Sequence, residues 1–308
     1  MTSRVESRVA VNKTYKLYIG GKFPRSESGR SYEVYAAPSS RSRSGAGRFL
    51  ANAAQGSRKD ARDAVTAARA AQPGWAAATA YNRGQVLYRV AEVMESRRPQ
   101  LVQEVRDAEG LSPAAAEAVV SQSIDRWVWY AGWSDKYVQI LGGLNPVAGP
   151  YFNISASEPT GVVAVLAPQE SSLLGLVSVL APVIVSGNAV VVVTSGDRPL
   201  PAITLAECLA TSDVPGGVVN ILSGRAAEIA PWLASHRDVN AIDLCGAAGA
   251  DGVDWAALEE ASADNLKRVL RPAGEGAGAV EPDWNQTPDL SRLTAFLETK
   301  TVWHPKGR

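Results

Sequence analysis

The stretch that decides the fold is Glu158–Val193, which reads EPTGVVAVLAPQESSLLGLVSVLAPVIVSGNAVVVV. Two runs of small and β-branched apolar residues, 162–167 and 189–193, are typical of strands that are buried on both faces. The apolar residues 173–185 between them are numerous enough for a helix, and Gly187-Asn188 predicts the turn into the second strand. A strand, a helix and another strand in this order predict a right-handed crossover and a parallel sheet.

The same alternation continues along the chain as far as Leu270. We expect further strands at 218–222, 241–244 and 267–270, separated by helices at 200–211, 226–235 and 255–263. Ahead of the sheet, apolar residues at helical spacing predict helices at 57–71, 82–97, 99–108 and 112–142. A hairpin is predicted at 15–23, around Gly20-Gly21. The predicted fold class is α/β, a Rossmann-like doubly wound parallel sheet with N-terminal helices.

The composition excludes several classes of function. The 308 residues contain 31 basic and 31 acidic side chains, so the net charge is zero and nucleic-acid binding is not expected. The two cysteines and two histidines lie far apart, without the spacing of metal ligands, and no metal site is expected. The longest apolar stretch is broken by Pro182 and Gly187, so no membrane segment is expected. Few cysteines and a polar N-terminus favour a cytoplasmic protein.

Several segments together resemble one family, the aldehyde dehydrogenase superfamily. They are YIGGKF at 18–23, EPTGVVAVLAP at 158–168, LAPVIVSGNAVVVV at 180–193, VPGGVVNILSG at 214–224 and ETKTVW at 298–303. The resemblance implies a dinucleotide-binding domain and a strand arm that pairs subunits. It breaks at Arg271 and resumes only in the tail, 298–307. The missing stretch is the one that carries the family's nucleophilic cysteine and its aldehyde-binding domain.

The resemblance also allows the family's working positions to be compared one by one. Glu170 stands where the family has the asparagine whose amide holds the oxyanion, and an ionised carboxylate cannot donate that hydrogen bond. Pro272 stands where the family has its glutamate base. Val193 and Gly196 replace the lysine and glutamate that contact the adenosine ribose. The only candidate for a replacement nucleophile is Cys245, which is either a thiol activated at a strand end or a packed core cysteine.

Residual cofactor binding remains an alternative at this stage. The positions that the resemblance implies for contacts with NAD or NADP are Pro168, Gln169, Thr194, Gly224, Gly246 and Ala247. Gly246 keeps a turn that backbone N–H groups can use to bind an anion, although Ala247 lacks the family's hydroxyl. The losses around these positions make it more probable that no cofactor is bound.

The expected organisation has five parts. They are a hairpin and helical part at 1–142, an arm strand at 143–158, a Rossmann-like βα domain at 159–272, a linker at 273–289 and an oligomerisation tail at 290–308. Two functions follow. The first is a non-catalytic structural or regulatory subunit, in a homo-oligomer or a hetero-oligomer with a full-length aldehyde dehydrogenase. The alternative is an NAD(P)-dependent aldehyde oxidoreductase that is weakly active or is completed by a partner's catalytic domain.

Overall fold

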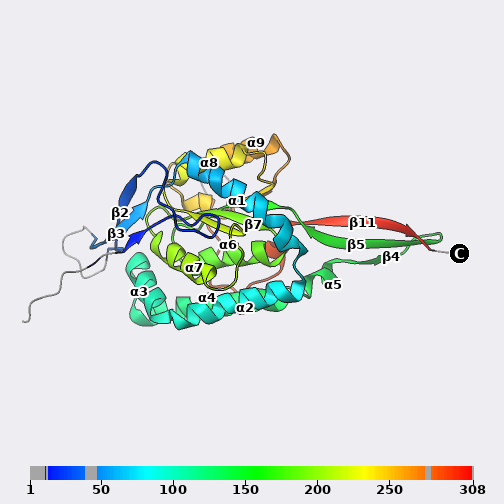
Figure 1. Cartoon of the computed structure of the whole chain (residues 1–308), viewed down its shortest axis with the longest axis horizontal. Helices are drawn as coiled ribbons and strands as arrows, with labels where there is room; N and C mark the ends of the chain where they lie inside the picture. The colour runs from blue at the N-terminus through cyan, green and yellow to red at the C-terminus, as the bar shows by residue number, and fades with distance from the viewer. Residues whose placement is uncertain (1–10, 12, 39–46, 275–278, 307–308) are drawn as a thin grey trace, which may run out of the picture.

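The computed structural model describes residues 11, 13–38, 47–274 and 279–306. These residues form a layered body and a long, thin arm that extends from one end of it (Figure 1). Within the described residues, no helix combines the length and the apolar character needed to cross a membrane.

The centre of the body is a five-stranded parallel sheet in the order β10-β9-β6-β7-β8. Its strands are β6 (Val162–Leu166), β7 (Ala189–Val193), β8 (Val219–Leu222), β9 (Ala241–Asp243) and β10 (Arg268–Leu270). The chain begins in the middle, adds two strands on one side and then two on the other, so the predicted doubly wound sheet is confirmed. Every residue of β6 and β7 is buried, as expected for strands covered on both faces.

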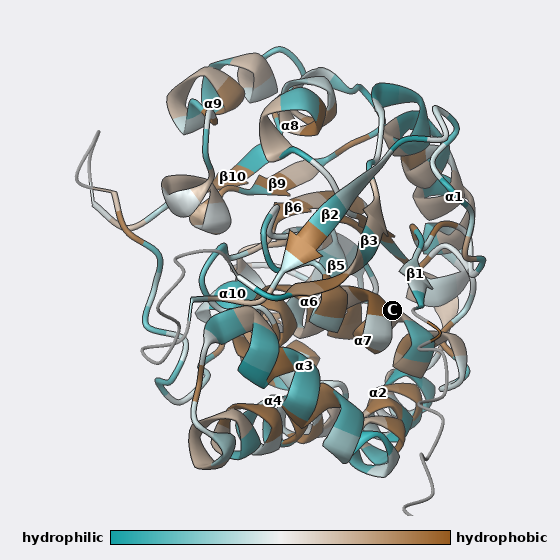
Figure 2. Cartoon of the chain, turned by 90° about the vertical axis from the view of Figure 1, so that its left-hand side faces the viewer, coloured by the Kyte–Doolittle hydropathy of each residue, from teal (hydrophilic) through white to brown (hydrophobic). Residues whose placement is uncertain are grey.

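Helices cover both faces of this sheet (Figure 2). One layer contains α6 (Leu174–Val185) and α7 (Leu200–Ala210), with α2 (Ala80–Ser96), α3 (Arg98–Glu109) and α4 (Pro113–Trp133) packed outside them. The other layer contains α1 (Arg58–Ala77), α8 (Ala226–Ser235) and α9 (Trp255–Ala263). Because α6 lies between the sheet and α4, it is buried all round, which explains why its sequence is apolar without a polar stripe.

The N-terminal part differs from the predicted hairpin. Ile19 and Lys22 exchange two backbone hydrogen bonds around Gly20-Gly21, so the turn forms. The Leu17 N–H also donates to the Pro24 carbonyl at 3.1 Å across this turn, while Tyr18 bonds to Ile221 of β8 and Tyr15 lies in a separate sheet. That sheet has the order β1-β3-β2, with β1 (Thr14–Tyr15), β2 (Ser31–Tyr35) and β3 (Phe49–Ala54). Tertiary pairing is thus added to the local pairing that the alternation suggested.

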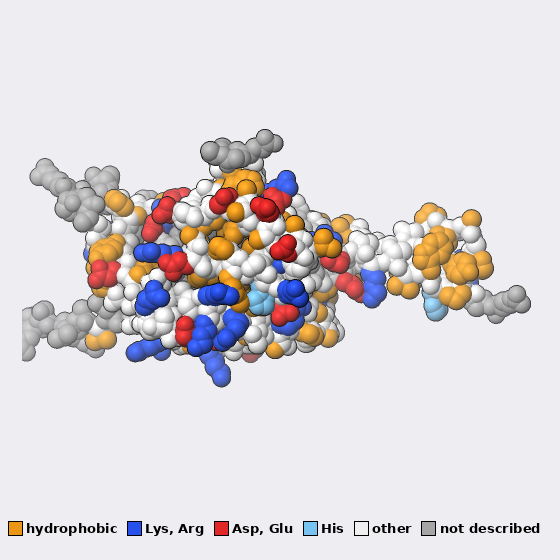
Figure 3. All heavy atoms as spheres, turned by 90° about the horizontal axis from the view of Figure 1, so that it is seen from above, with side chains coloured by type: hydrophobic (Ala, Val, Ile, Leu, Met, Phe, Trp, Pro, Cys, Tyr) orange, Lys and Arg blue, Asp and Glu red, His pale blue; other side chains and the backbone are white. Residues whose placement is uncertain are grey.

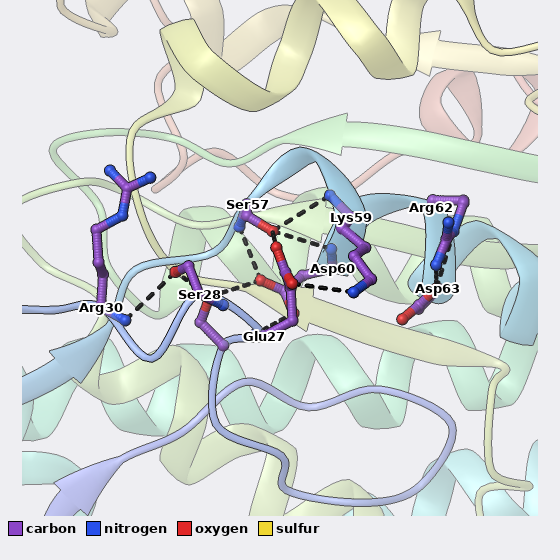
Figure 4. A network of polar contacts seen from close by, with 9 residues as sticks. Glu27, Ser28, Arg30, Ser57, Lys59, Asp60, Arg62 and Asp63 are labelled. Atoms are coloured by element: carbon purple, nitrogen blue, oxygen red, sulfur yellow. Dashed lines mark hydrogen bonds and ion pairs between the residues drawn. The ribbon is translucent and has the colours of Figure 1, made fainter.

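A capping box fixes the start of α1 (Figure 4). The Ser57 backbone N–H donates to the Asp60 carboxylate at 2.8 Å, and the Asp60 N–H donates to Ser57 Oγ at 3.3 Å. The same buried carboxylate accepts from the Ser26 hydroxyl at 2.7 Å and from the Glu27 N–H at 3.0 Å. The helix start therefore also anchors the loop that follows the N-terminal turn.

The single long helix predicted for 112–142 is wrong. Helix α4 ends at Trp133, a turn follows at 134–136, and the short helix α5 (Tyr137–Leu141) comes after it. Tyr137 is buried, and its hydroxyl donates to the Ser186 carbonyl at the end of α6. A side chain at Gly84 would strike Ser134 Oγ, so α2 approaches the turn closely. Packing against α2 and α6 thus interrupts a sequence that could have continued as one helix.

The arm consists of β4 (Gly143–Asn145), β5 (Tyr151–Pro159) and β11 (Leu297–Pro305), in the order β11-β5-β4. Strands β5 and β11 pair antiparallel along nine residues, from Leu297 opposite Pro159 to Pro305 opposite Tyr151. The strand predicted in the tail is therefore confirmed, and its partner is the arm strand predicted from the middle of the chain. In Figure 1 both strands extend well beyond the body.

The expected linker is not loose where the structure describes it. Residues 275–278 lie outside the described part, but Val280 pairs with Ala273, and the Trp284 side chain is only 7% exposed. Helix α10 (Ser291–Thr294) follows and packs against α6. The sequence of residues 279–289 is rich in turn-forming residues, but tryptophan can bury a large apolar area, and this burial holds the segment on the body.

Candidate functional site

A cleft of about 700 Å³ lies at the carboxyl ends of four parallel strands. The turns after β6, β7, β8 and β9 all reach it, as the strand order of a doubly wound sheet requires. We call it the strand-end cleft. Its walls include Tyr32, Gln55, Gln169, Glu170, Ser195, Gly196, Asp197, Arg198, Gly224 and the backbone of residues 249–252.

Two of the six predicted cofactor positions line this cleft. Gln169 is held by the chain itself, since its Nε2 donates to the Ala167 carbonyl at 2.7 Å and its Oε1 accepts from the Gly196 N–H at 3.3 Å. Gly224 has a φ of +132°, and a Cβ there would lie 3.0 Å from the Gly56 nitrogen. The glycine is thus required by the backbone, whatever the cleft contains.

The other four predicted positions lie behind the cleft wall. Thr194 is buried, and its hydroxyl donates to the Ser195 carbonyl at 3.1 Å. Pro168 and Ala247 are also buried. Gly246 belongs to the short helix η1 (Cys245–Gly249), and a Cβ on it would lie 2.3 Å from the Ala167 carbonyl oxygen. The turn predicted at Gly246-Ala247 is present, but the cleft is lined by residues 249–252, which follow it, and not by these two residues.

The turn between β6 and α6 is occupied by two carboxylates from distant segments. The Gln169 N–H donates to Glu281 Oε1 at 2.6 Å. The N–H and the hydroxyl of Ser172 both donate to Glu109 Oε1, each at 2.7 Å. Backbone N–H groups at this turn are the donors that an external anion would need. Both are already satisfied by side chains of the chain.

Glu109 and Glu281 were not predicted from the sequence. Burial raises the pKa of each carboxyl above its ordinary value, and the hydrogen bonds from the turn oppose that effect. Glu109 is the last residue of α3, and Glu281 lies in the segment predicted as a linker. Neither position carries a motif, so only the packing of these segments against α6 brings them to the turn.

The position of Glu170 does not suit the binding of an oxyanion. Its side chain is exposed and pairs with Arg198, Nη2 to Oε2 at 2.6 Å. Arg198 also donates to the Glu170 carbonyl at 2.5 Å. The ion pair spans the turns after β6 and β7, and closes one wall of the cleft.

Cys245 is a packed cysteine, not an activated thiol. Its side chain is 3% exposed, and its Sγ donates to the Arg271 carbonyl at 3.4 Å. Burial and the adjacent Asp243 carboxylate raise the pKa of this thiol, so the lowered pKa considered from its strand-end position is wrong. His236 ends α8 and His304 lies on the arm, so neither serves as a base for it. Among the described residues, no group of three side chains forms a metal site.

The position at which the family has its glutamate base has no group that can accept a proton. Pro272 is buried directly after β10, and it has no proton-accepting side chain. Arg271 beside it pairs with Glu259, Nε to Oε1 at 2.7 Å. Glu275, three residues further on, lies outside the described residues. Only residues 271–290 separate β10 from α10, so no further domain is inserted there.

Together, the doubly wound sheet, the strand-end cleft and the projecting arm define a Rossmann-like protein of the dehydrogenase type. The family model described as "Aldehyde dehydrogenase family" matches residues 37–285, and the chain belongs to this family. It is 30% identical over 304 residues to the cytosolic 10-formyltetrahydrofolate dehydrogenase of Pongo abelii, covering 94% of this chain and 32% of that protein. It is 32% identical over 232 residues to the mitochondrial aldehyde dehydrogenase of Rattus norvegicus, covering 74% and 44%.

A solved structure shows the same fold. The NAD+ complex of an aldehyde dehydrogenase from Bacillus cereus matches with a TM-score of 0.74 and 24% identity, over 83% of this chain and 50% of that one. The chain therefore spans about a third to a half of the length of the proteins it matches.

Proposed function

We propose that this chain is a non-catalytic member of the aldehyde dehydrogenase family that acts as a structural or regulatory subunit. The observation that carries the proposal is the arm. Its two long strands come from segments about 140 residues apart and still pair along nine residues. The chain thus keeps both strands of the arm, although it lacks the segment that carries the family's nucleophile.

One face of the arm carries an apolar row. Leu144, Ile154 and Val302 lie directly opposite one another on the three strands, and they are 65%, 47% and 47% exposed. Phe152 follows on the same face. In Figure 3 hydrophobic side chains gather toward the far end of the arm. Apolar side chains in such a group favour contact with another protein.

The edges of the arm add a second reason for assembly. Strand β11 is an outer strand of nine residues, so one row of its backbone groups has no partner strand. An exposed edge of this length can pair with a strand of another chain. A second copy of this chain, or a full-length aldehyde dehydrogenase, would supply such a surface.

The strand-end cleft supports the non-catalytic part of the proposal. No nucleophile with an accessible thiol is found among the described residues, and the base position is Pro272. The donors of the β6–α6 turn hold Glu109 and Glu281. Val193, at the position of the family's ribose-binding lysine, is fully buried in the core. We therefore expect weak or no binding of NAD and NADP.

The alternative is residual binding of NAD(P), with activity that is weak or that depends on a partner's catalytic domain. It is favoured by the cleft itself, which keeps about 700 Å³ in the place that a doubly wound sheet offers to dinucleotides. The similar Bacillus cereus protein was solved with NAD+. The size of the cleft permits this alternative, although the side chains around it oppose it.

Three measurements on the same purified protein test the proposal. Light scattering is expected to give a mass that is a multiple of the 32.5 kDa chain, or a stable complex with an added full-length aldehyde dehydrogenase. Calorimetry with NAD and NADP is expected to show no saturable binding, and incubation with an aldehyde and NAD is expected to yield no NADH. A monomer that joins no such partner would overturn the assembly function. Production of NADH that Cys245→Ser abolishes would establish the alternative.

A further inference from the structure

A second cavity, of about 340 Å³, lies where the segment after β10 packs against α4 and α6. It is separate from the strand-end cleft, and no residue lines both. Its polar lining includes Arg126 and Tyr130 of α4, Ser178 of α6 and Arg292 of α10, together with the carboxylates Asp283 and Asp289. Its apolar walls are Leu270, Pro282, Trp284 and Pro288.

Arg126 is a buried cation without an anionic partner among the described residues. It is 8% exposed, and its guanidinium donates to Ser178 Oγ at 2.5 Å and to the Gln286 carbonyl at 2.7 Å. Both acceptors are neutral. Burial lowers the pKa of Arg126, and the nearby Arg292 lowers it further. A buried charge of this kind is costly unless an opposite charge faces it.

The carboxylates around the cavity are committed elsewhere. Asp243 is fully buried and pairs with Arg292, Oδ2 to Nη1 at 2.8 Å, while it also accepts from the Cys245 N–H. Asp283 accepts from Asn285, and Asp289 accepts from Ser291. Arg271 at the mouth is paired with Glu259. Asp283 and Asp289 therefore remain charged on the cavity wall, and Asp243 is paired with Arg292, but the partners of Arg126 among the described residues are the two neutral groups alone.

A second buried arginine shows what a purely structural role requires. Arg83 of α2 is 6% exposed and donates to three carbonyl groups, those of Ala76, Ala78 and Val185. All three lie at the C-terminal ends of helices, where the helix dipole places negative partial charge. Arg126 lies in the middle of α4 and has no such compensation from a helix end.

We propose that this cavity binds a small organic carboxylate, with Arg126 as its main cationic ligand. A guanidinium group can donate two parallel hydrogen bonds to a carboxylate, and Arg126 has N–H groups beyond the two that bond within the chain. The Tyr130 hydroxyl lines the same cavity and is a further donor. Trp284 and the two prolines would receive a short aliphatic or aromatic group, and the cavity volume suits a ligand of this size.

The test is calorimetry on the full chain with sodium benzoate, sodium acetate and inorganic phosphate as probes. We expect saturable binding of benzoate at one site per chain, weaker binding of acetate and none of phosphate. Arg126→Met is expected to weaken benzoate binding at least about 30-fold, because it removes the charge that faces the carboxylate. Arg83→Met is the matched control, since it removes an equally buried arginine outside the cavity, and benzoate affinity should not change.

If Arg126→Met does not fold, the variant Tyr130→Phe still tests the proposal. It preserves the aromatic packing and removes one donor, so an affinity loss of about 5-fold is expected. The proposal is overturned if benzoate shows no saturation up to about 10 mM, a concentration at which even very weak specific sites fill. It is also overturned if phosphate binds in preference to both carboxylates, or if folded Arg126→Met and Tyr130→Phe bind benzoate as the unchanged chain does.

Discussion

The carboxyl edge of the central sheet and the arm have opposite characters, although one family fold contains both. At the sheet edge, the donors of the β6–α6 turn are satisfied by Glu109 and Glu281, and Cys245 is buried. On the arm, apolar side chains and a strand edge remain exposed. The polar groups of the sheet edge are bonded within the chain, while the apolar side chains and the strand edge of the arm are free to contact another protein.

The difference follows from what each region needs. Catalysis requires particular atoms within a fraction of an ångström, so we expect single changes such as those at Glu170 and Pro272 to abolish it. Strand pairing needs only an extended backbone and an alternating pattern, and many sequences satisfy both. We therefore expect an assembly surface to tolerate sequence changes that would remove an active site.

The largest expected effect is on the arm. Val302→Asp places a charge at the β11 end of the row formed with Leu144 and Ile154, and burying that charge in an interface costs several kcal/mol. We expect the dissociation constant of the oligomer to rise about 30-fold or more, measured by analytical ultracentrifugation. Thr299→Asp, on the opposite face near the base, should leave the mass unchanged. Equal masses for Val302→Asp and the unchanged chain would remove the apolar row from the interface.

The next effect concerns the cysteines. Cys208 and Cys245 are both buried, and burial raises the pKa of each thiol. Labelling by a disulfide reagent at about pH 7.5 should be at least about 100-fold slower in the folded chain than in denaturant. One thiol that reacts at the free rate and is protected by NAD would show hidden chemistry at the sheet edge, and would break the contrast between the two regions.

A smaller effect is expected when the β6–α6 turn is opened. Glu281→Ala frees the Gln169 N–H, which can then donate to an anionic ligand. We expect the unchanged chain to bind NAD with a Kd above about 1 mM. Calorimetry should show about 5- to 10-fold tighter NAD binding by the variant. Asp283→Ala, a nearby acidic change that leaves the turn intact, is the control. Micromolar binding by the unchanged chain would show that the carboxylates do not close the cleft.

The smallest effect is a pH dependence at the sheet edge. Burial raises the pKa of Glu109, so the stability associated with this group is fully present below its unfolded pKa and is lost as pH rises through its folded pKa. Glu109→Gln should remove a decrease of about 1 kcal/mol or less between about pH 4 and pH 7, measured by urea unfolding. Glu158→Gln, on the exposed arm, should leave the pH profile unaltered. Parallel profiles for all three proteins would refute the assignment.

Much of the fold could be predicted because local pattern and tertiary structure agree there. Helices α8 and α9 have the predicted bounds, and β6 and β7 are the buried strands expected from their apolar runs. The single predicted helix across 112–142 was wrong, and the hairpin predicted at 15–23 forms only around its turn, because Tyr137 and Tyr18 bind distant segments. Local propensity cannot register such contacts.

The candidate site was predicted less well than the fold. Gln169 and Gly224 line the strand-end cleft, but Thr194, Gly246 and Ala247 are buried behind it. Sequence comparison located the correct turns, but the residues that line the cleft lie two or three positions from several of the predicted ones. Glu109, Glu281 and Arg126 carry no motif, so the sequence offered no signal for them.

By itself, the sequence determined the α/β class, the doubly wound order and the strands of the arm, and it predicts the loss of the family's nucleophile, oxyanion donor and base. These depend on periodicity and on residue identity, which are written in the chain. Only the tertiary structure decided that two carboxylates fill the β6–α6 turn, that Cys245 is packed and that Arg126 is buried without a counter-charge. Those properties arise because segments far apart in the chain meet, and burial in their contacts sets the charge balance.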